Sequence, residues 1–247
     1  MKTPSQRAGS RAQYDLIVRH YSALSELPPA DIEIIRNLPP AETWAAGAEI
    51  QTEASPSQPR FLLSGWAARF KMLRDGRRQI LSIILPGDGI GVCERLTPLA
   101  LSAIATLTAV RTADAAPLVA ALREHSHPLL QQAVHLANAV DEKCLIDQVV
   151  RNGRHTAHER ICHLFMELHW RLTLSGAVDS QTMPWPLTQE MIADSLGLSI
   201  VHVNRMLQQM RREKLIEAGH GMLTILKPEE MLAISEFRPP QPSVATG

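Results

Sequence analysis

The stretch of sequence that decides the fold is LTQEMIADSLGLSIVHVNRMLQQMRREKLI, residues 187–216. It predicts two helices joined by a glycine, the first at 189–196 and the second at 199–214. Two helices can cross steeply only where a small residue lies between them and the turn reaches a left-handed backbone angle. Ala193 and Gly197 meet these two needs. The spacing is typical of a helix-turn-helix that binds DNA.

The two faces of the second predicted helix differ in chemistry. At roughly 100° per residue, one face is apolar and is expected to be buried. Its members are Val203, Met206, Leu207 and Met210. The other face is polar, and no acidic residue occurs within 199–212. Four basic residues and one acidic residue in 199–216 give this segment a charge of +3, in a chain with 25 Lys+Arg and 25 Asp+Glu. A solvated amphipathic helix is the alternative, but the absence of carboxylates favours binding in the major groove.

We expect the exposed side of this motif to contact DNA. The residues expected there are Thr188, Gln189, Ser199, Val201, His202, Asn204, Arg205, Gln208 and Arg212. Arg205 lies near the middle of the face, and an arginine can donate two hydrogen bonds to guanine N7 and O6. Gln208 and Arg212 lie further along the helix and are expected to meet phosphate.

The sequence after this motif predicts a winged helix. Residues 215–217 and 222–226 have the character of short strands on either side of the turn Gly219-His220-Gly221. Pro228 then suits the first position of a closing helix.

The N-terminal half predicts a small β-roll. Short apolar runs in 44–112 are separated by turn signals such as Asp75-Gly76, which tolerates the positive φ angles of a hairpin. Residues 14–38 predict one or two helices. The expected fold class is therefore α+β, with an N-terminal β-roll of the double-stranded β-helix or jelly-roll type, a long helix and a C-terminal winged helix-turn-helix.

A long helix is predicted from Pro128 to the break at Asn152-Gly153, and 156–159 (Thr-Ala-His-Glu) predicts a capping box that starts the next helix. Apolar residues in the long helix recur at steps of three and four. They are Leu130, Ala133, Ala137, Val140 and Cys144. Such a stripe is either the seam of a two-helix coiled coil or the inner face of a core helix. Residues 175–186 are interpreted as a linker.

The expected organisation has five parts. They are a disordered tail (1–13), a sensor β-roll domain with N-terminal helices (14–127), a dimerisation helix (128–152), a winged helix-turn-helix domain (153–237) and a second disordered tail (238–247). The N-terminus has no apolar stretch of the kind a secretory signal needs. The longest uncharged stretch, 96–110, falls short of the roughly 20 residues that span a bilayer. We expect a cytoplasmic protein without membrane contact.

Three strings together resemble the Crp/Fnr family of bacterial transcription regulators over about residues 14–237. They are LLSGWAARFKMLRDGRRQILSIILPGD (62–88), AHERICHLFMEL (157–168) and the stretch at 187–216. The resemblance implies a sensor roll like a cyclic-nucleotide-binding domain, a dimerising helix and a winged helix that reads DNA. It favours the homodimer seam for the stripe in the long helix, and an inverted repeat of double-stranded DNA as the target. RNA polymerase is a further expected partner.

The family's residues carry over only position by position. Its base-reading arginine matches Arg205. Val201 stands where the family often has a glutamate that reads cytosine, and Ile200 stands where some relatives have an arginine. The preferred half-site therefore differs from the familiar one, and His202 and Asn204 can carry the difference.

The effector is left open by the sequence. Gly91-Val92 and Leu101-Ser102-Ala103 replace the charged phosphate-binding residues of the members that bind cAMP, so cAMP is not expected. The first cysteine is Cys93, so the N-terminal cysteine cluster of the oxygen-sensing branch, and with it an iron–sulfur cluster, is not expected either. The histidines on the helix after Thr156 lack the spacing for zinc or haem, and no metal site is predicted.

Two other functions remain as alternatives. A β-roll metalloenzyme needs two or three histidines with a carboxylate inside the roll. Residues 44–112 contain no histidine, so we do not expect an enzyme. The other alternative is a protein-binding adaptor that uses the helix-turn-helix as a docking surface.

Overall fold

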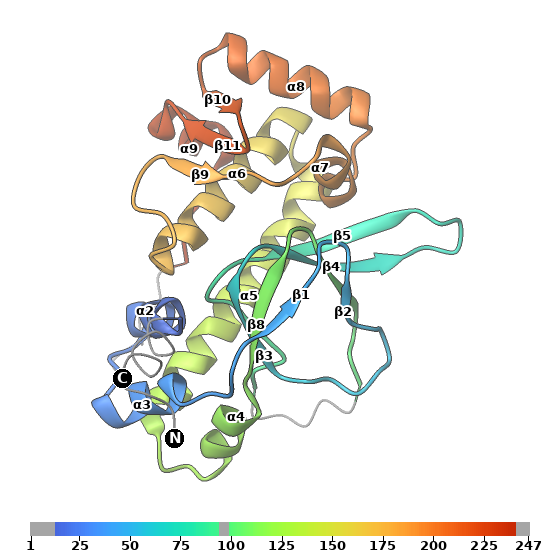
Figure 1. The fold of residues 1–247 in the computed structure, drawn as a ribbon. Coiled ribbons are helices and arrows are strands. Elements are labelled where there is room, and N and C mark those ends of the chain that lie inside the picture. The colour runs from blue at the N-terminus through green and yellow to red at the C-terminus, as the bar shows by residue number, and fades with distance from the viewer. Residues whose placement is uncertain (1–12, 94–98, 241–247) are drawn as a thin grey trace.

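The computed structural model describes residues 13–93 and 99–240. A β-roll with flanking helices, a long helix and a winged helix-turn-helix follow one another along the chain (Figure 1). The first part contains α2 (Asp15–Leu24), α3 (Pro29–Arg36), β1 (Glu42–Trp44), β2 (Glu49–Gln51), β3 (Arg60–Ser64), β4 (Ala67–Met72), β5 (Arg78–Ile84), β6 (Gly89–Ile90), β7 (Ala103–Thr106), β8 (Val110–Asp114) and α4 (Ala116–Arg123). The second part contains α5 (Pro128–Arg154), α6 (Ala157–Leu174), β9 (Thr182–Pro184), α7 (Gln189–Leu196), α8 (Ile200–Arg212), β10 (Ile216–Gly219), β11 (Met222–Ile225) and α9 (Pro228–Ser235).

The roll consists of two antiparallel four-stranded sheets. Their strand orders are β1-β8-β3-β6 and β2-β7-β4-β5. Apolar side chains from both sheets, such as Leu62, Ala67, Ile84 and Ile104, form one buried cluster between them. The α+β class and the order of roll, long helix and winged helix-turn-helix, predicted from the sequence, are confirmed.

Part of the roll packs directly against the winged helix. Apolar side chains of β4 and β5, such as Phe70 and Ile83, belong to the same buried cluster as α6 and the helix-turn-helix. The β4–β5 hairpin therefore lies against α7 (Figure 1).

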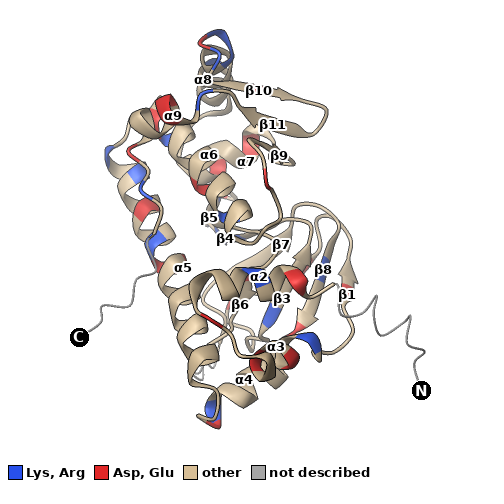
Figure 2. Ribbon diagram, turned by 90° about the vertical axis from the view of Figure 1, so that its left-hand side faces the viewer, with Lys and Arg blue, Asp and Glu red and all other residues tan. Residues whose placement is uncertain are grey.

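The long helix α5 runs beside the roll and reaches the winged helix (Figure 2). It continues two residues past the predicted break, because Gly153 does not adopt a positive φ and a single glycine in a helix costs only about 1 kcal/mol. The next helix begins with the predicted capping box. The Thr156 backbone N–H donates to the Glu159 carboxylate at 2.8 Å, and the Glu159 N–H donates to the Thr156 hydroxyl at 3.4 Å. None of the helices in the described ranges is both long and apolar enough to cross a bilayer.

The predicted linker 175–186 contains a strand, which corrects the sequence analysis. Strand β9 pairs with β11, and the register places Met183 opposite Leu223. Met183 is fully buried. A strand of three residues that includes a proline is too short to show the alternation by which strands are recognised.

The predicted seam of α5 also requires correction. Leu130 and Ala133 are buried in a cluster with α2 and α4, and Val140 and Cys144 are buried against Leu24 of α2. Ala137 packs against both clusters. The chain's own helices cover this stripe, so it is not open to a partner. The spacing identified a buried face correctly, but a pattern cannot say which molecule buries it.

Candidate DNA interface

The turn between α7 and α8 has the geometry that the sequence predicted. Gly197 ends α7 with φ 63° and ψ 36°, in the left-handed region. The hydroxyl of Thr188 caps α7 by accepting from the Met191 N–H, and the hydroxyl of Ser199 caps α8 by accepting from the His202 N–H, both at 3.2 Å. Each cap satisfies a backbone donor that the helix leaves unpaired, which fixes where the helix begins.

The predicted inner face of α8 is confirmed. Its four apolar residues, Val203, Met206, Leu207 and Met210, are all buried. Packing of this face against α6 and α7 fixes the rotation of α8 about its own axis. The opposite face therefore points away from the protein.

The outer face of α8 is open. Val201 is 81 % exposed, and Ile200 is about half exposed. Arg205 is exposed, and its guanidinium makes no hydrogen bond or ion pair with the described residues. An arginine with all of its donors unused can donate to an external acceptor without first breaking an internal bond.

Three of the predicted contact residues meet in a small amide cluster. The Asn204 carbonyl oxygen accepts from the side-chain amides of Gln189 and Gln208, each at 3.4 Å. Asn204, His202 and Gln189 are half-buried, whereas Gln208 is exposed. The cluster joins the start of α7 to the outer face of α8.

The C-terminal end of α8 is basic (Figure 2). Arg211, Arg212 and Lys214 are exposed there. The neighbouring Glu213 accepts a hydrogen bond from Gln209 at 2.8 Å and lies 3.6 Å from His158 of α6. Because this carboxylate is directed towards the protein, the outer face of α8 keeps a positive charge.

The carbonyl end of α7 is held by the roll, a contact that the sequence analysis did not predict. The side-chain amide of Gln79, on β5, donates to the carbonyls of Asp194 at 2.8 Å and Ser195 at 3.1 Å. Arg78 forms an ion pair with the Asp194 carboxylate at 2.8 Å. The last carbonyls of a helix have no partner within the helix, so these donors stabilise the end of α7.

The two long helices hold the same end of α7. Gln148 and Asn152 of α5 donate to the Ser195 carbonyl, the latter at 3.2 Å. Arg160 of α6 donates to the Leu196 carbonyl at 3.0 Å. The roll, α5 and α6 thus converge on the last turn of the first helix of the motif.

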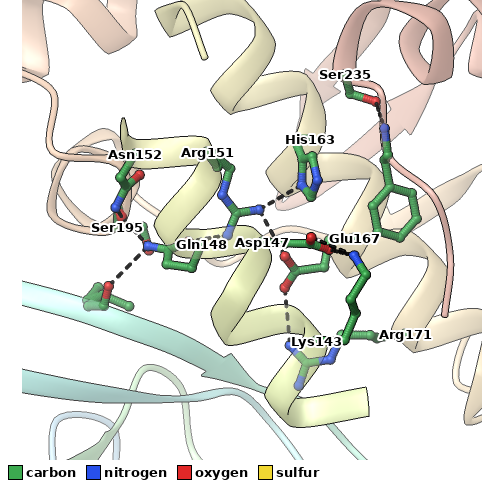
Figure 3. A network of polar contacts seen from close by, with 12 residues as sticks. Lys143, Asp147, Gln148, Arg151, Asn152, His163, Glu167, Arg171, Ser195 and Ser235 are labelled. Carbon is green, nitrogen blue, oxygen red and sulfur yellow. Dashed lines mark hydrogen bonds and ion pairs between the residues drawn. The ribbon is translucent and has the colours of Figure 1, made fainter. Parts of the chain in front are cut away.

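A buried network of charges links α5 and α6 (Figure 3), and an ion pair extends it to the roll. Arg151 of α5 donates to the Glu167 carboxylate at 2.9 Å and contacts a ring nitrogen of His163 at 3.0 Å. Arg171 forms an ion pair at 2.5 Å with Asp88, which lies in the turn between β5 and β6. Removing one partner from such a network leaves an unpaired buried charge, which typically costs about 3–5 kcal/mol.

His163 is kept neutral in this network. Burial and the neighbouring Arg151 charge lower the pKa of His163 to about 4. Cys144, at the edge of the same region, is an unreactive thiol because burial raises its pKa and the thiolate is the reactive form. Among the residues that the structure describes, no three His, Cys, Asp or Glu side chains are grouped to hold a metal ion.

The positions that would hold a cyclic nucleotide have different surroundings. Val92 is buried in the cluster under α2, α4 and α5, and Leu101 is 79 % exposed. Neither side chain can pair with a phosphate. Residues 94–98 between them lie outside the described residues.

Comparisons with known proteins agree with this geometry. Residues 159–234 match the family described as Crp-like helix-turn-helix domain. The nitrogen fixation regulation protein FixK of Bradyrhizobium diazoefficiens is 29% identical over 226 residues, which are 90% of this chain and 92% of that protein. The transcriptional activatory protein AadR of Rhodopseudomonas palustris is 28% identical over 230 residues, 92% of this chain and 94% of that protein.

The fold comparison gives the same result. The solved structure of FixK2 from Bradyrhizobium japonicum matches with a TM-score of 0.69 and 22% identity, over 79% of this chain and 96% of that chain. The relatives are transcription regulators, and the likeness extends from the roll to the wing. These matches support a transcription regulator of the Crp/Fnr type, whose residues 159–234 form a Crp-like helix-turn-helix domain.

Proposed function

We propose that this regulator binds an inverted repeat of double-stranded DNA as a homodimer, with α8 of each chain in the major groove. The observation that carries the proposal is the outer face of α8, which is exposed, free of carboxylates and followed by a basic end. A helix in the major groove needs such a face, because phosphates flank the groove and repel acidic side chains. The alternative of a solvated amphipathic helix offers no reason for this charge pattern.

The roles of the individual residues follow from their places on α8. Arg205 lies mid-face with its donors unused, which suits a bidentate contact to a guanine. Val201, at the N-terminal end, can touch a thymine methyl but cannot accept from a cytosine amine. Gln208 and Arg212 lie further along the helix and suit phosphate contacts.

The remaining predicted contacts belong to the helix starts and the flanks of α8. Thr188 and Ser199 are the N-cap residues of α7 and α8, where unpaired backbone N–H groups can donate to phosphate. Gln189 and Asn204 are half-buried and orient Gln208 through the amide cluster, whereas the half-buried His202 lies outside this cluster and can contribute to the half-site preference.

The proposed dimer uses a face of α5 next to the one that the sequence predicted. Exposed apolar residues form a patch on its C-terminal half. They are Leu145, Ile146, Val149 and Val150. Val149 is 74 % exposed, and a cluster of such residues on one helix is normally covered by a partner. A second copy of α5 in the symmetric orientation would cover it and place the two α8 helices for two half-sites about one DNA turn, ~34 Å, apart.

The cellular role follows from DNA binding. A regulator of this kind works in the cytoplasm, where bacterial DNA lies, and acts through RNA polymerase. We expect no catalytic activity. The buried Val92 and the exposed Leu101 argue against cAMP as the effector, and neither an iron–sulfur cluster nor haem is expected.

Selection of random double-stranded DNA by the purified protein, followed by sequencing, tests the proposal. The expected product is an inverted repeat bound by two chains, with an affinity that falls steeply as salt rises. Selection of no sequence, together with binding to a protein partner through α8, would instead support the adaptor alternative and contradict the proposal.

A further inference from the structure

A pocket of about 550 Å³ lies between the roll and the winged helix. Leu16 of α2 and Trp66 at the start of β4 line one side, and Val178 and Trp185 on the winged-helix side line the other. Pockets that hold small organic molecules have volumes of about 300–1,000 Å³. The pocket is therefore of the size of a small-molecule site, and it is separate from the nucleotide positions of the roll.

The walls of this pocket are apolar and flat. Trp66 and Trp185 stand edge to face, with ring centroids 6.2 Å apart and planes at 77°. Three prolines, Pro86, Pro184 and Pro186, add flat aliphatic rings. Aromatic rings favour offset or edge-to-face contact with such surfaces, so the shape suits an aromatic ligand.

The charge of the ligand is constrained as well. None of the described lining residues carries a charge. The Arg19 side chain lies against Gly176 but is not part of the lining, so a charged ligand inside the pocket would lose its hydration without gaining an ion-pair partner among the lining residues, which is strongly unfavourable. The pocket therefore selects uncharged molecules.

Three side-chain polar groups in the lining, the Ser64 hydroxyl and the indole N–H groups of Trp66 and Trp185, make no hydrogen bond with the described residues and are available to a ligand. The Thr108 hydroxyl is already used, since it accepts from the backbone N–H of Trp66 at 3.0 Å and donates to the Ala109 carbonyl at 3.1 Å. A ligand with one hydroxyl or carbonyl group on an aromatic ring would match this arrangement.

We propose that this pocket binds an uncharged aromatic molecule with at most one or two polar groups, and that its occupancy alters the affinity for DNA. The binding itself does not depend on the proposed function, whereas the coupling to DNA rests on it. Coupling is expected because the lining residues come from both the roll and the winged helix, and the winged helix contains the helix that is proposed to bind DNA. Gly65 and Pro86 belong to the roll, and Pro184 pairs with Met222 in the sheet of the wing.

The physical basis of the coupling is differential affinity. A ligand that bridges the roll and the wing binds one relative placement of the two more tightly than another. It therefore raises the population of molecules in the placement that it binds more tightly. By linkage, DNA must change the affinity for the ligand by the same factor.

The neutral dye N-phenyl-1-naphthylamine tests the site in the full-length protein. Its fluorescence should rise saturably with one dye per chain, with excitation transfer from tryptophan because two tryptophans line the pocket. Ala177→Phe should weaken dye binding at least tenfold, since Ala177 is an exposed, small lining residue and the new ring would fill the space. Ala120→Phe, on the exposed side of α4, is the matched control and should bind the dye as the wild type does. The sulfonated dye 1-anilinonaphthalene-8-sulfonate should bind at least tenfold more weakly.

Dye binding that is absent, or that Ala177→Phe leaves unchanged, would overturn the site, whatever the protein does with DNA. The coupling is read by measuring the dye affinity with and without the selected DNA. A change of threefold or more, matched by the change in DNA affinity at saturating dye, is expected. Equal affinities in a protein that binds both dye and DNA would overturn the coupling, whereas a protein that binds dye but no DNA would contradict the proposed function alone.

Discussion

The side-chain amide of Gln79, on strand β5 of the roll, lies 2.8 Å from the carbonyl oxygen of Asp194 in the last turn of the first helix of the DNA-binding motif. These residues are 115 positions apart in the chain. The same amide reaches the Ser195 carbonyl, where Gln148 and Asn152 of the long helix also donate. A displacement of the roll would therefore act directly on the helix that supports α8.

Gln79→Ala should uncouple the roll from the motif. The carbonyls of Ile80, Asp194 and Ser195 each lose a donor, so the free energy of unfolding should fall by about 1–2 kcal/mol. DNA affinity should fall while the preferred sequence stays the same, because no residue of α8 is changed. Chemical denaturation and DNA titration check both effects. Gln181→Ala, at an exposed glutamine whose side chain makes no hydrogen bond with the described residues, is the control. Equal losses in the two variants would contradict the role of Gln79.

Val149→Glu should weaken the homodimer. The substitution places two like charges across the proposed apolar interface, and the cost is several kcal/mol. Sedimentation equilibrium should show dissociation at concentrations at which the wild type is a dimer. Leu101→Glu, at an equally exposed apolar residue on the roll, should leave the dimer intact. A dimer of unchanged strength in Val149→Glu would exclude this face of α5.

Val140→Glu should behave differently from Val149→Glu. Val140 is 5 % exposed and packs inside the single chain, so a buried carboxylate there should destabilise the fold itself. Thermal unfolding should show a lowered Tm at every protein concentration. A folded, stable monomer in this variant would restore the seam that the sequence predicted.

Titration of His163 should make the free energy of unfolding depend on pH in the acidic range. Its pKa of about 4 lies below the ordinary value of 6.5, so between these values the unfolded chain binds more protons than the folded chain. The free energy of unfolding should therefore fall as the pH falls from 6.5 to 4, by about 1.4 kcal/mol per unit.

His163→Gln checks this assignment, because the amide oxygen can still accept from Arg151 but does not titrate. The variant should show a flatter stability profile between pH 6.5 and 4. NMR titration of the wild-type imidazole should place its pKa near 4. A value near 6.5 would show that the ring is not held neutral by burial.

Val201→Glu should change which bases are preferred. Valine can only make apolar contact, whereas a carboxylate can accept from the amine of cytosine. Selection from random DNA should gain a cytosine in each half-site relative to the wild type. An unchanged selected sequence would show that position 201 does not face the bases.

The sequence predicted local features well and long-range contacts poorly. The left-handed Gly197, the capping box at Thr156 and the buried Val203 were all predictable, because each follows from residues within one or two helical turns. The Gln79–Asp194 contact could not be predicted, because a glutamine on a strand can donate to many partners and only the fold selects one.

The long helix shows the same limit. The spacing of Leu130 to Cys144 indicates a buried face, but only the placement of α2 and α6 shows that the chain itself buries it. Strand β9 was missed because its pairing with β11 comes from tertiary structure. The contact of Arg205 with DNA is a prediction, because it depends on a DNA molecule that is not part of the structure.

Competition binding of Arg205→Ala to a panel of single-base variants of the selected DNA tests the central claim most directly. We predict a loss of about 1–3 kcal/mol per half-site and the loss of preference for one guanine–cytosine pair in each half-site. Arg212→Ala should instead weaken all sequences alike and reduce the salt slope by about one unit for each phosphate that the variant no longer neutralises. If Arg205→Ala keeps the wild-type preference at every position and reduces only the overall affinity, Arg205 binds the DNA backbone and α8 does not read bases through it.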